Sequence, residues 1–416
     1  MASASFAPLR HRSFTLALVS YFISSSGTWM QSVALGIYLT ETTHNAVWLG
    51  LLTVCAWTPS LIGSPLGGVV ADRWNRQHWI QAMNLIMAAT ATTLAVCALT
   101  HHLTPRLIVT LAVVEGLASA ASWSAWQSLL PDLVAREEVL AAVSLSSAQF
   151  NLGRIIGPLL AAVALTVGSY GACFAANAAS FIFVVVTFAF VRSPSRPAPT
   201  TRVRPFAELA VGARQAWRVR GCRYPILGIA AVAVTVSPFI ALVPAMAIQV
   251  LHAGKVGTSW MVTAQGVGAV VGALTLPALA KRTSRLTVLR GSIVTAAVSL
   301  VLYGVAPTLA LSMAALVVVG GAYVGVLTGL NTSVQLHAPV SERSRILSLY
   351  TLSLSLAYPL GALGQSALAR TWGVREVTVA GGVTMVAFLT LVSLVWPALW
   401  GEIASAPPGP AALLAD

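Results

Sequence analysis

Two residues of opposite charge lie deep inside apolar stretches of this sequence, Glu115 in one stretch and Arg154 in the next. A single charge at the centre of a bilayer costs roughly 2.5–3.5 kcal/mol on insertion scales, so such residues need a partner or a function. At about 1.5 Å per residue, Glu115 lies about 12 Å from the outer end of its helix, and Arg154 about 22 Å from the inner end of its own. In a core about 30 Å thick these depths nearly coincide. We predict that the two side chains face each other or a central cavity.

Two interpretations of this charge pair stay open at the level of sequence. Glu115 and Arg154 could form a permanent buried ion pair that only fixes the packing of two neighbouring helices. Alternatively, the pair takes part in transport, because charges inside a membrane usually mark ion or substrate pathways. Arg154 favours an ionised Glu115, and a cavity opening alternately to each side would let the carboxylate take up a proton in exchange for a substrate.

Further polar and aromatic residues lie at similar depth and are candidates for a substrate cavity. Gln31, Gln149 and Asn151 are polar side chains inside apolar stretches. Each of them is also suited to an ordinary hydrogen bond between helices. Trp29 and Trp57 fall in the middle of their stretches rather than at the headgroup level, so bundle packing and substrate contact are both open for them.

The elements that must position these residues are membrane-spanning helices. Hydrophobic residues make up 57% of the 416 residues and charged residues 8%, a balance that would aggregate a soluble protein. About 20 apolar residues in helical form cross a bilayer, and backbone groups in hydrocarbon must be satisfied internally. We therefore predict an all-α polytopic membrane protein. Its twelve spans are expected at residues 14–39, 45–71, 78–100, 107–130, 139–168, 170–191, 224–251, 259–280, 286–306, 308–337, 346–369 and 378–400.

Lysine and arginine then predict the orientation of the spans. With the N-terminus in the cytoplasm, nineteen of the twenty-four Lys and Arg residues fall in inner segments and four in outer loops; Arg154 is the remaining one. This asymmetry obeys the positive-inside rule and places both termini in the cytoplasm. The net charge of +13 is then explained by topology and anionic headgroups, which argues against nucleic acid as a partner.

The spans divide into two halves of six. We expect an N-terminal half at 1–192, a cytoplasmic linker at 193–223, a C-terminal half at 224–400 and a short cytoplasmic tail at 401–416. The linker begins with an extended Pro-rich stretch. It continues with apolar residues at helical spacing beside arginines, which is typical of an amphipathic helix in the inner interface. Pro158 and Pro359 occupy matching places in the fifth span of each half, as a parallel repeat predicts.

Two motifs then resemble those of the major facilitator superfamily. Residues 68–76 read Gly-Val-Val-Ala-Asp-Arg-Trp-Asn-Arg, which resembles the Gly-x-x-x-Asp-Arg-x-x-Arg signature in the loop after span two. Residues 153–162 read Gly-Arg-Ile-Ile-Gly-Pro-Leu-Leu-Ala-Ala, which resembles the antiporter motif of span five with alanines for its last two glycines. Segments 27–35, 130–134 and 151–158 resemble the branch that contains enterobactin exporters and macrolide efflux pumps.

The resemblance implies a fold of two pseudo-symmetric six-helix halves and roles for the motif residues. It implies a conformational latch at Gly68, Asp72, Arg73 and Arg76. It also implies a rigid, leak-limiting bend at Gly153, Gly157 and Pro158. Many proton-coupled drug antiporters carry an arginine in span four, whereas this chain has Glu115 at the comparable place. The proton relay of that group therefore cannot be copied onto this chain.

We therefore expect a monomeric secondary transporter in the inner membrane of a bacterium. It would export a small amphiphilic molecule, drug-like or a siderophore, by proton antiport. An importer or proton symporter on the same fold, and a non-transporting membrane sensor, are the alternatives. No nucleotide-binding loop of the form Gly-x-x-x-x-Gly-Lys-Ser/Thr occurs, so we expect the proton gradient rather than ATP to drive it. We expect no catalytic residues, cofactor or metal; the partners would be the substrate and the lipid bilayer, with no nucleic acid.

Overall fold

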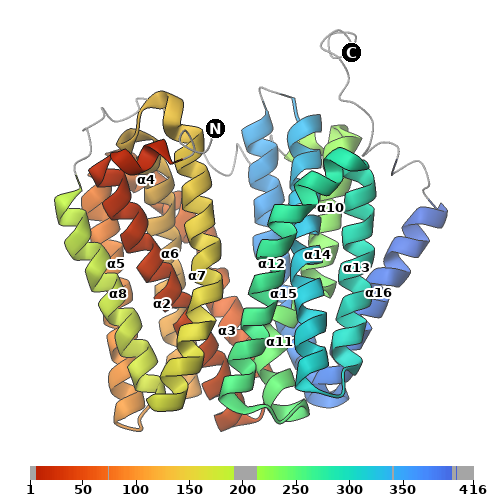
Figure 1. Cartoon of the computed structure of the whole chain (residues 1–416), viewed down its shortest axis with the longest axis horizontal. Coiled ribbons are helices and arrows are strands. Elements are labelled where there is room, and N and C mark those ends of the chain that lie inside the picture. Colours follow the sequence, from red (N-terminus) through yellow and green to blue (C-terminus); the bar gives the residue numbers. More distant parts are fainter. Residues whose placement is uncertain (1–5, 74, 192–212, 340–341, 396–399, 401–416) are drawn as a thin grey trace. The chain divides into compact units, whose positions relative to one another are not determined.

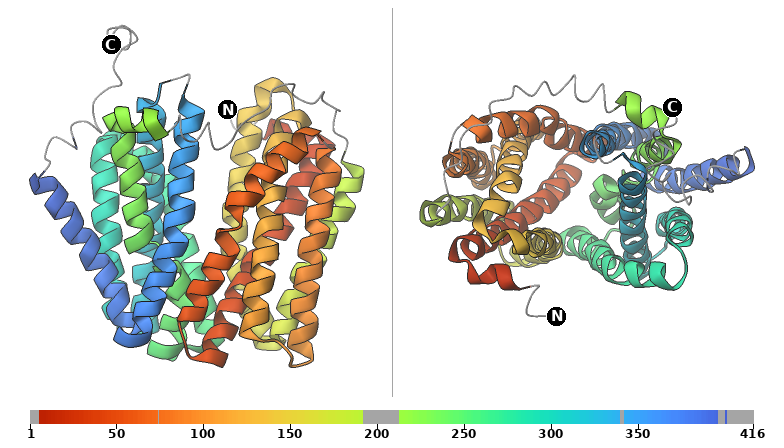
Figure 2. Two further views of the ribbon diagram at one scale, coloured as in Figure 1. Left: turned by 180° about the vertical axis from the view of Figure 1, so that it is seen from behind. Right: turned by 90° about the horizontal axis from the view of Figure 1, so that it is seen from above.

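The computed structural model describes residues 6–73, 75–191, 213–339, 342–395 and 400, and within these ranges it contains helices and no strands. The chain forms two compact units. The first contains residues 1–201 together with 243–263, and the second contains residues 202–242 and 264–416. Figure 1 shows the helices of each unit running side by side, and the view from above in Figure 2 shows most of them nearly end-on. This is the all-α membrane fold that the sequence predicts.

The helices of the N-terminal half are α2 Arg12–Thr43, α3 Val47–Trp57, α4 Ser60–Arg73, α5 Arg76–Leu99, α6 Pro105–Leu129, α7 Val139–Val167 and α8 Tyr170–Phe190. Short 3₁₀ turns precede α2 and separate α6 from α7: η1 Ala7–Arg10, η2 Leu130–Leu133 and η3 Arg136–Glu138. The helices of the C-terminal half are α10 Arg220–Thr235, α11 Phe239–Ala245, the π-helical η4 Met246–Val250, α12 Gly254–Arg282, α13 Arg285–Val305, α14 Leu309–His337, α15 Arg343–Trp372 and α16 Val374–Val395. Each predicted span coincides with one of these helices or with a consecutive set of them.

Eleven spans in the described ranges are long and apolar enough to cross a membrane. The first predicted span, which is α2, is not among them, although it is 32 residues long. Polar side chains lower its mean hydropathy, and several of them are buried: Ser20, Ser24, Ser26, Gln31 and Thr40. The polarity of α2 is therefore directed into the protein, where hydrogen bonds can satisfy it.

Two spans that we predicted as continuous are broken at prolines. The span at 45–71 divides into α3 and α4 around Thr58 and Pro59, and the span at 224–251 divides into α10 and α11 around Pro238. Proline has no backbone N–H and its ring displaces the preceding turn, so an α-helix bends or ends there. Hydropathy predicts the length of such a span but not the interruption of the helix at the proline.

The first unit is built around the packing of α2 against α7 and α8. Gly153 and Gly157 of α7 lie directly against α2. A Cβ atom at Gly157 would lie 2.7 Å from the carbonyl oxygen of Ser26 and 2.9 Å from the amide nitrogen of Met30. A small-residue face of this kind lets two helices pack backbone to backbone. Pro158 is buried in the same helix.

The second unit repeats this arrangement, with α15 packed on α10. A Cβ atom at Gly361 would lie 2.7 Å from the Cα atom of Val234. One turn further on, the amide nitrogen of Gln365 donates to the carbonyl oxygens of Val234 and Thr235, at 2.9 and 2.8 Å. A fifth helix with a Pro-Gly face packed on a first helix is therefore common to both halves.

Most of the predicted linker lies outside the described residues. Its last part, residues 213–218, is helical, with Ala216 buried and Trp217 55% exposed. A buried alanine beside an exposed tryptophan suits a helix that lies on the surface of a bundle. The rest of the predicted amphipathic stripe, from Phe206 to Ala210, falls in residues that the structure does not describe.

Candidate functional site

A chain of polar side chains crosses the middle of the first unit and ends at Glu115. The side-chain nitrogen of Gln31 in α2 donates to both carboxylate oxygens of Glu115 in α6, at 3.0 and 2.8 Å. The Gln31 oxygen accepts from the amide nitrogen of Asn177 in α8 at 3.0 Å. The hydroxyl of Ser180 donates to the Asn177 oxygen at 3.1 Å. Three helices are thus linked by hydrogen bonds that all point toward the carboxylate.

Arg154 belongs to a different cluster, formed mainly by aromatic rings. Its guanidinium carbon lies 5.5 Å from the ring centroid of Trp29. Trp29 meets Phe150 edge to face at 6.3 Å, and Phe150 meets Trp123 at 5.7 Å. In this structure Glu115 and Arg154 are therefore engaged by different neighbours, an amide and an indole. Their joint role in proton coupling stays a prediction.

The other predicted cavity residues separate in the structure. The carboxamide oxygen of Gln149 accepts a hydrogen bond of 3.5 Å from Ser25, so this buried residue joins α7 to α2. The amide nitrogen of Asn151 donates to the carbonyl oxygen of Ser147 in its own helix, and both residues line a pocket. Trp57 is the last residue of α3 and is 46% exposed. Asn151 is therefore the predicted cavity residue that lines a pocket, while Gln149 fits the alternative of a bond between helices.

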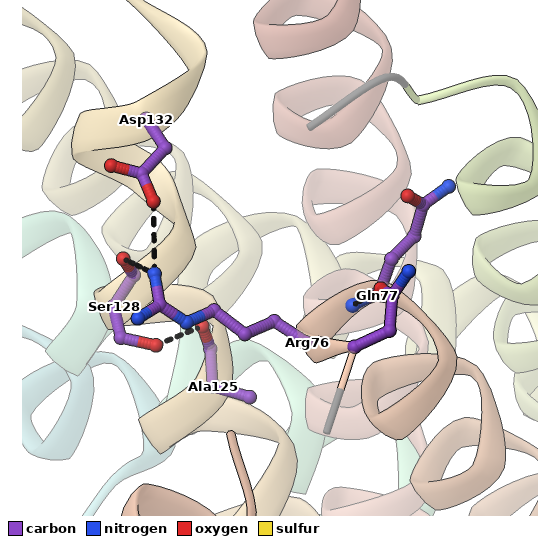
Figure 3. Close-up of polar contacts among 6 residues, drawn as sticks. Arg76, Gln77, Ala125, Ser128 and Asp132 are labelled. Atoms are coloured by element: carbon purple, nitrogen blue, oxygen red, sulfur yellow. Dashed lines mark hydrogen bonds and ion pairs between the residues drawn. The ribbon is translucent and has the colours of Figure 1, made fainter. Parts of the chain in front are cut away.

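A buried ion pair lies at the end of the first unit where α2 begins, which is the end predicted to be cytoplasmic. Arg76 opens α5, and its guanidinium donates to the Asp132 carboxylate at 2.9 Å and to the carbonyl oxygen of Ser128 at 3.0 Å. The Asp132 side chain is 1% exposed and that of Arg76 is 19% exposed. Figure 3 shows Arg76 extending from the start of α5 to the end of α6. A pair this deeply buried ties the two helices together strongly, because neither charge can be left alone.

The residue after Arg76 ties the same helix start to a second neighbour. The Gln77 amide donates to the carbonyl oxygen of Val191 at 2.6 Å and to that of Phe188, both at the end of α8. In Figure 3 the Gln77 side chain points away from that of Arg76. The start of α5 is therefore held between the ends of α6 and α8. These bonds also satisfy carbonyl groups that the last turns of those helices would leave open.

The remaining residues of the predicted latch end the preceding helix. Gly68, Asp72 and Arg73 lie in the last turns of α4, and their side chains fall outside the described part of the structure. Arg76, the last residue of the predicted latch, pairs with Asp132. The latch itself stays a prediction.

At the opposite end of the same unit, a cluster holds the start of α12 to the N-terminal helices. The hydroxyl of Tyr170 in α8 donates to the Glu41 carboxylate of α2 at 2.5 Å. The Lys255 ammonium lies 3.6 Å from the same carboxylate and 4.5 Å from the centroid of the Tyr170 ring. Tyr38 stacks edge to face on Tyr170 at 5.1 Å. Residues 243–263 thus have polar contacts that match their place in the first unit.

The sequence analysis identified the charged and polar candidates but missed the residues that they contact. Asp132 is an acid beside Pro131 in a loop predicted to be cytoplasmic, like the loop of Arg76, a feature that could have identified it as a partner for Arg76. Asn177 is a lone amide in the apolar stretch 170–191, and its depth could have suggested the link to Gln31. Phe150 gave no signal, because a phenylalanine in a membrane helix is ordinary.

Comparison with known proteins identifies the kind of protein that carries these features. The family described as transmembrane secretion effector matches residues 3–407. The enterobactin exporter EntS of Citrobacter koseri is 25% identical over 403 residues, which cover 94% of this chain and 93% of that protein. Macrolide efflux protein A of Streptococcus pyogenes is 23% identical over 348 residues, which cover 83% of this chain and 86% of that protein.

A third relative, the staphyloferrin A transporter of Staphylococcus aureus, is 31% identical over 177 residues. That match covers 41% of this chain and spans less than half of the relative, 44% of its length. All three relatives bear the names of transporters or efflux proteins, not of enzymes.

Solved structures show the same fold. The nucleoside transporter NupG superimposes with a TM-score of 0.73 at 12% identity, covering 94% of this chain and 99% of its own. A bacterial homologue of the human lysosomal transporter Spinster gives a TM-score of 0.74 at 15% identity, covering 95% of this chain and 99% of its own. The family match, the named relatives and the helical membrane fold agree. This chain is a multi-pass membrane protein that belongs to the transmembrane secretion effector family of the major facilitator superfamily.

Proposed function

We propose that this protein exports a small amphiphilic molecule, either drug-like or a siderophore, from the bacterial cytoplasm in exchange for protons. Its relatives are named as an enterobactin exporter, a macrolide efflux protein and a staphyloferrin A transporter, which supports export of compounds of this size. The excess of Lys and Arg in the predicted inner loops supports an inner-membrane protein with both termini in the cytoplasm. We further propose that it acts as a monomer by alternating access.

The observation that carries proton coupling is the neutral partner of Glu115. Gln31 donates to both oxygens of this carboxylate, an arrangement that suits the ionised form. A permanent ion pair with Arg154 would hold the proton affinity of Glu115 low at every step. An amide partner is uncharged, so the carboxyl group can take up and release a proton as its surroundings change.

Proton uptake at Glu115 would also change the hydrogen bonds behind it. A protonated carboxyl group keeps one acceptor oxygen and gains one O–H donor, and Gln31 accepts from that donor when it turns its oxygen toward Glu115. The nitrogen of Gln31 would then face the nitrogen of Asn177, which would have to turn as well. The Asn177 oxygen now accepts from Ser180; after the turn the Asn177 nitrogen would face that hydroxyl, so the direction of this hydrogen bond would reverse. Protonation of Glu115 can thus change the side-chain hydrogen bonds of Gln31 in α2 and Asn177 in α8. We propose that this links protonation to conformational change.

The test compares substrate-triggered proton movement through the native protein and through the Glu115→Gln variant. The protein is reconstituted in liposomes with an imposed pH gradient, and lumenal pH is followed while dyes, macrolides and catecholate siderophores are added. We expect proton flux with the native protein and at least a tenfold slower flux with Glu115→Gln, because the amide carries no exchangeable charge.

Glu376→Gln in the first turn of α16 makes the same chemical change away from the polar chain and should keep the native flux. Proton-dependent transport at the native rate in Glu115→Gln would show that Glu115 is structural. Substrate movement without protons in the native protein would instead make it a facilitator or a differently coupled carrier.

A further inference from the structure

A small pocket lies between α6 and α7 in the first unit, beside the aromatic cluster. Its volume is about 130 Å³. It is lined by two aromatic rings and four polar side chains along with Val143: Trp123, Phe150, Gln127, Ser146, Ser147 and Asn151. An engineered cavity of roughly 150 Å³ binds benzene, and the pocket's volume is close to that, so a single planar ring is the size of group that it suits. Along α7 it extends from four to twelve residues beyond the helix start, about 6–18 Å at 1.5 Å per residue.

The polar side chains show that this face does not lie against lipid. Gln127 and Ser147 are both exposed, and neither side chain has a hydrogen bond within the described part of the chain. Asn151 uses its nitrogen within its own helix, which leaves its oxygen as an acceptor. Unpaired amides and hydroxyls are expensive in hydrocarbon, and membrane proteins keep them for water-filled or ligand-lined surfaces. This pocket therefore opens to water or to a ligand.

The aromatic residues connect the pocket to a positive charge. Trp123 and Phe150 line it, and Phe150 contacts Trp29 at its other edge. Trp29 in turn carries the Arg154 guanidinium on its face. A planar ring can stack on such residues, and the positive charge lies one residue beyond them. The site therefore offers a ring-sized pocket at one end and a cation at the other.

The charges decide which kind of ring fits. The Glu115 carboxylate receives two hydrogen bonds from Gln31, so its negative charge is directed toward α2 and α8. The charge that adjoins the aromatic cluster is that of Arg154. Arginine recognises carboxylates through its planar, multiply donating guanidinium group. A site for a cationic ligand would need the Glu115 carboxylate, not the Arg154 guanidinium, beside the aromatic cluster.

We propose that the α6–α7 pocket, with Trp29 and Arg154 above it, is a binding site for an aromatic acid: one planar ring that carries a carboxylate and a neighbouring polar group. The ring stacks against Phe150 and Trp123, and Gln127, Ser147 or Asn151 binds the polar substituent. The carboxylate faces Arg154. This inference rests on the proposed export function, because it identifies the class of substrate that enters at the predicted cytoplasmic half of the span.

Three small probes distinguish the elements of this proposal by saturation-transfer NMR on the purified protein in nanodiscs. Salicylate carries the ring, the hydroxyl group and the negative charge, salicylamide lacks the charge, and 2-hydroxycyclohexanecarboxylate lacks the aromatic face. We expect salicylate to bind at least fivefold more tightly than either of the others, after subtraction of empty nanodiscs. Equal binding of all three probes would overturn the proposal.

Variants then locate the site. Phe150→Leu should weaken salicylate binding about fivefold while leaving the protein folded, because leucine keeps the apolar contact but offers no ring face. Arg154→Met should abolish the preference for salicylate over salicylamide. Ser147→Leu should fill the pocket and exclude all three probes without any change of charge. The matched control is Phe388→Leu, at a phenylalanine of α16 that is 40% exposed. Native affinity in both Phe150→Leu and Ser147→Leu would place the ring elsewhere.

Because these measurements need no gradient, they separate the two proposals. Salicylate binding that follows the variants, in a protein without proton-coupled transport, would retain the site and reject the proposed antiport. Proton-coupled transport of another substrate, in a protein that does not bind salicylate, would retain the function and reject the aromatic-acid site.

Discussion

Replacing Gly157 by alanine will lower the thermal stability of the protein by several degrees and reduce its transport. The added methyl group would meet the carbonyl oxygen of Ser26 at 2.7 Å and the amide nitrogen of Met30 at 2.9 Å. These are backbone atoms, so no side chain can rotate away, and α7 must separate from α2. Inserting atoms into a tightly packed interface costs about 1–3 kcal/mol. The midpoint of heat-induced aggregation in detergent, measured by fluorescence-detected size exclusion, reports the change.

Two further glycines make the comparison quantitative. Gly364→Ala in α15 is the control, because a Cβ atom there meets nothing within 4 Å. Alanine is the better helix former by roughly 0.5–1 kcal/mol, so this variant should be neutral or slightly more stable. Gly153→Ala should fall between them, because the nearest obstacle is the Ser25 hydroxyl, which can rotate. Equal stability of the Gly157 and Gly364 variants would contradict the close packing of α2 and α7.

Arg76→Ala will destabilise the first unit more than the loss of any surface charge pair. The Asp132 side chain is 1% exposed and receives a 2.9 Å bond from this guanidinium. Removing one partner of a buried ion pair typically costs about 3–5 kcal/mol, because the other charge is left in a poor solvent. The link to the Ser128 carbonyl at 3.0 Å is lost as well. The same thermal assay should show a larger loss than for Gly157→Ala.

A double variant tests whether the charge itself is responsible. Arg76→Met combined with Asp132→Leu removes both charges and keeps apolar volume, so it should recover much of the stability that either single change loses. Glu342→Gln is the control, since it removes half of a pair with Arg345 that is 35% exposed on the arginine side. Pairs of that kind contribute about 0–1 kcal/mol. If Arg76→Ala behaved like Glu342→Gln, the buried pair would contribute no more than an exposed one.

The sequence was sufficient to predict the helices and the family, because both depend on local features. Apolar length predicts each span, and the motifs at residues 68–76 and 153–162 lie in consecutive residues. The breaks at Pro59 and Pro238 were missed, because a run of apolar residues has the same hydropathy whether or not a proline bends it. Local pattern therefore predicts which residues are in the membrane, and not the course of each helix.

The contacts of the candidate site could not be predicted in the same way. A residue's depth in the membrane follows from its place in the sequence, but the direction in which its side chain points does not. Counting residues placed Glu115 and Arg154 at similar depth, but it gave no rotation of either helix about its axis. That rotation is set by Gly153 and Gly157, which turn one face of α7 against α2 and place Arg154 over Trp29. Gln31 lies 84 residues before Glu115, so no local pattern could identify it as the partner.

The membership of residues 243–263 in the first unit bears on how chimeric transporters should be made from this chain. A chimera joined in the linker, near residue 201, would exchange six helices. Residues 243–263 would then come from a different transporter than the N-terminal helices against which they pack. Glu41 and Tyr170 would then meet a foreign residue in place of Lys255, and Gly36 a foreign residue in place of Pro244. Swaps that carry residues 243–263 along with the N-terminal half keep these contacts native. The junctions of such swaps fall within α11 and α12, and the contacts inside the first unit stay native, so substrate preference can be assigned to one unit or the other.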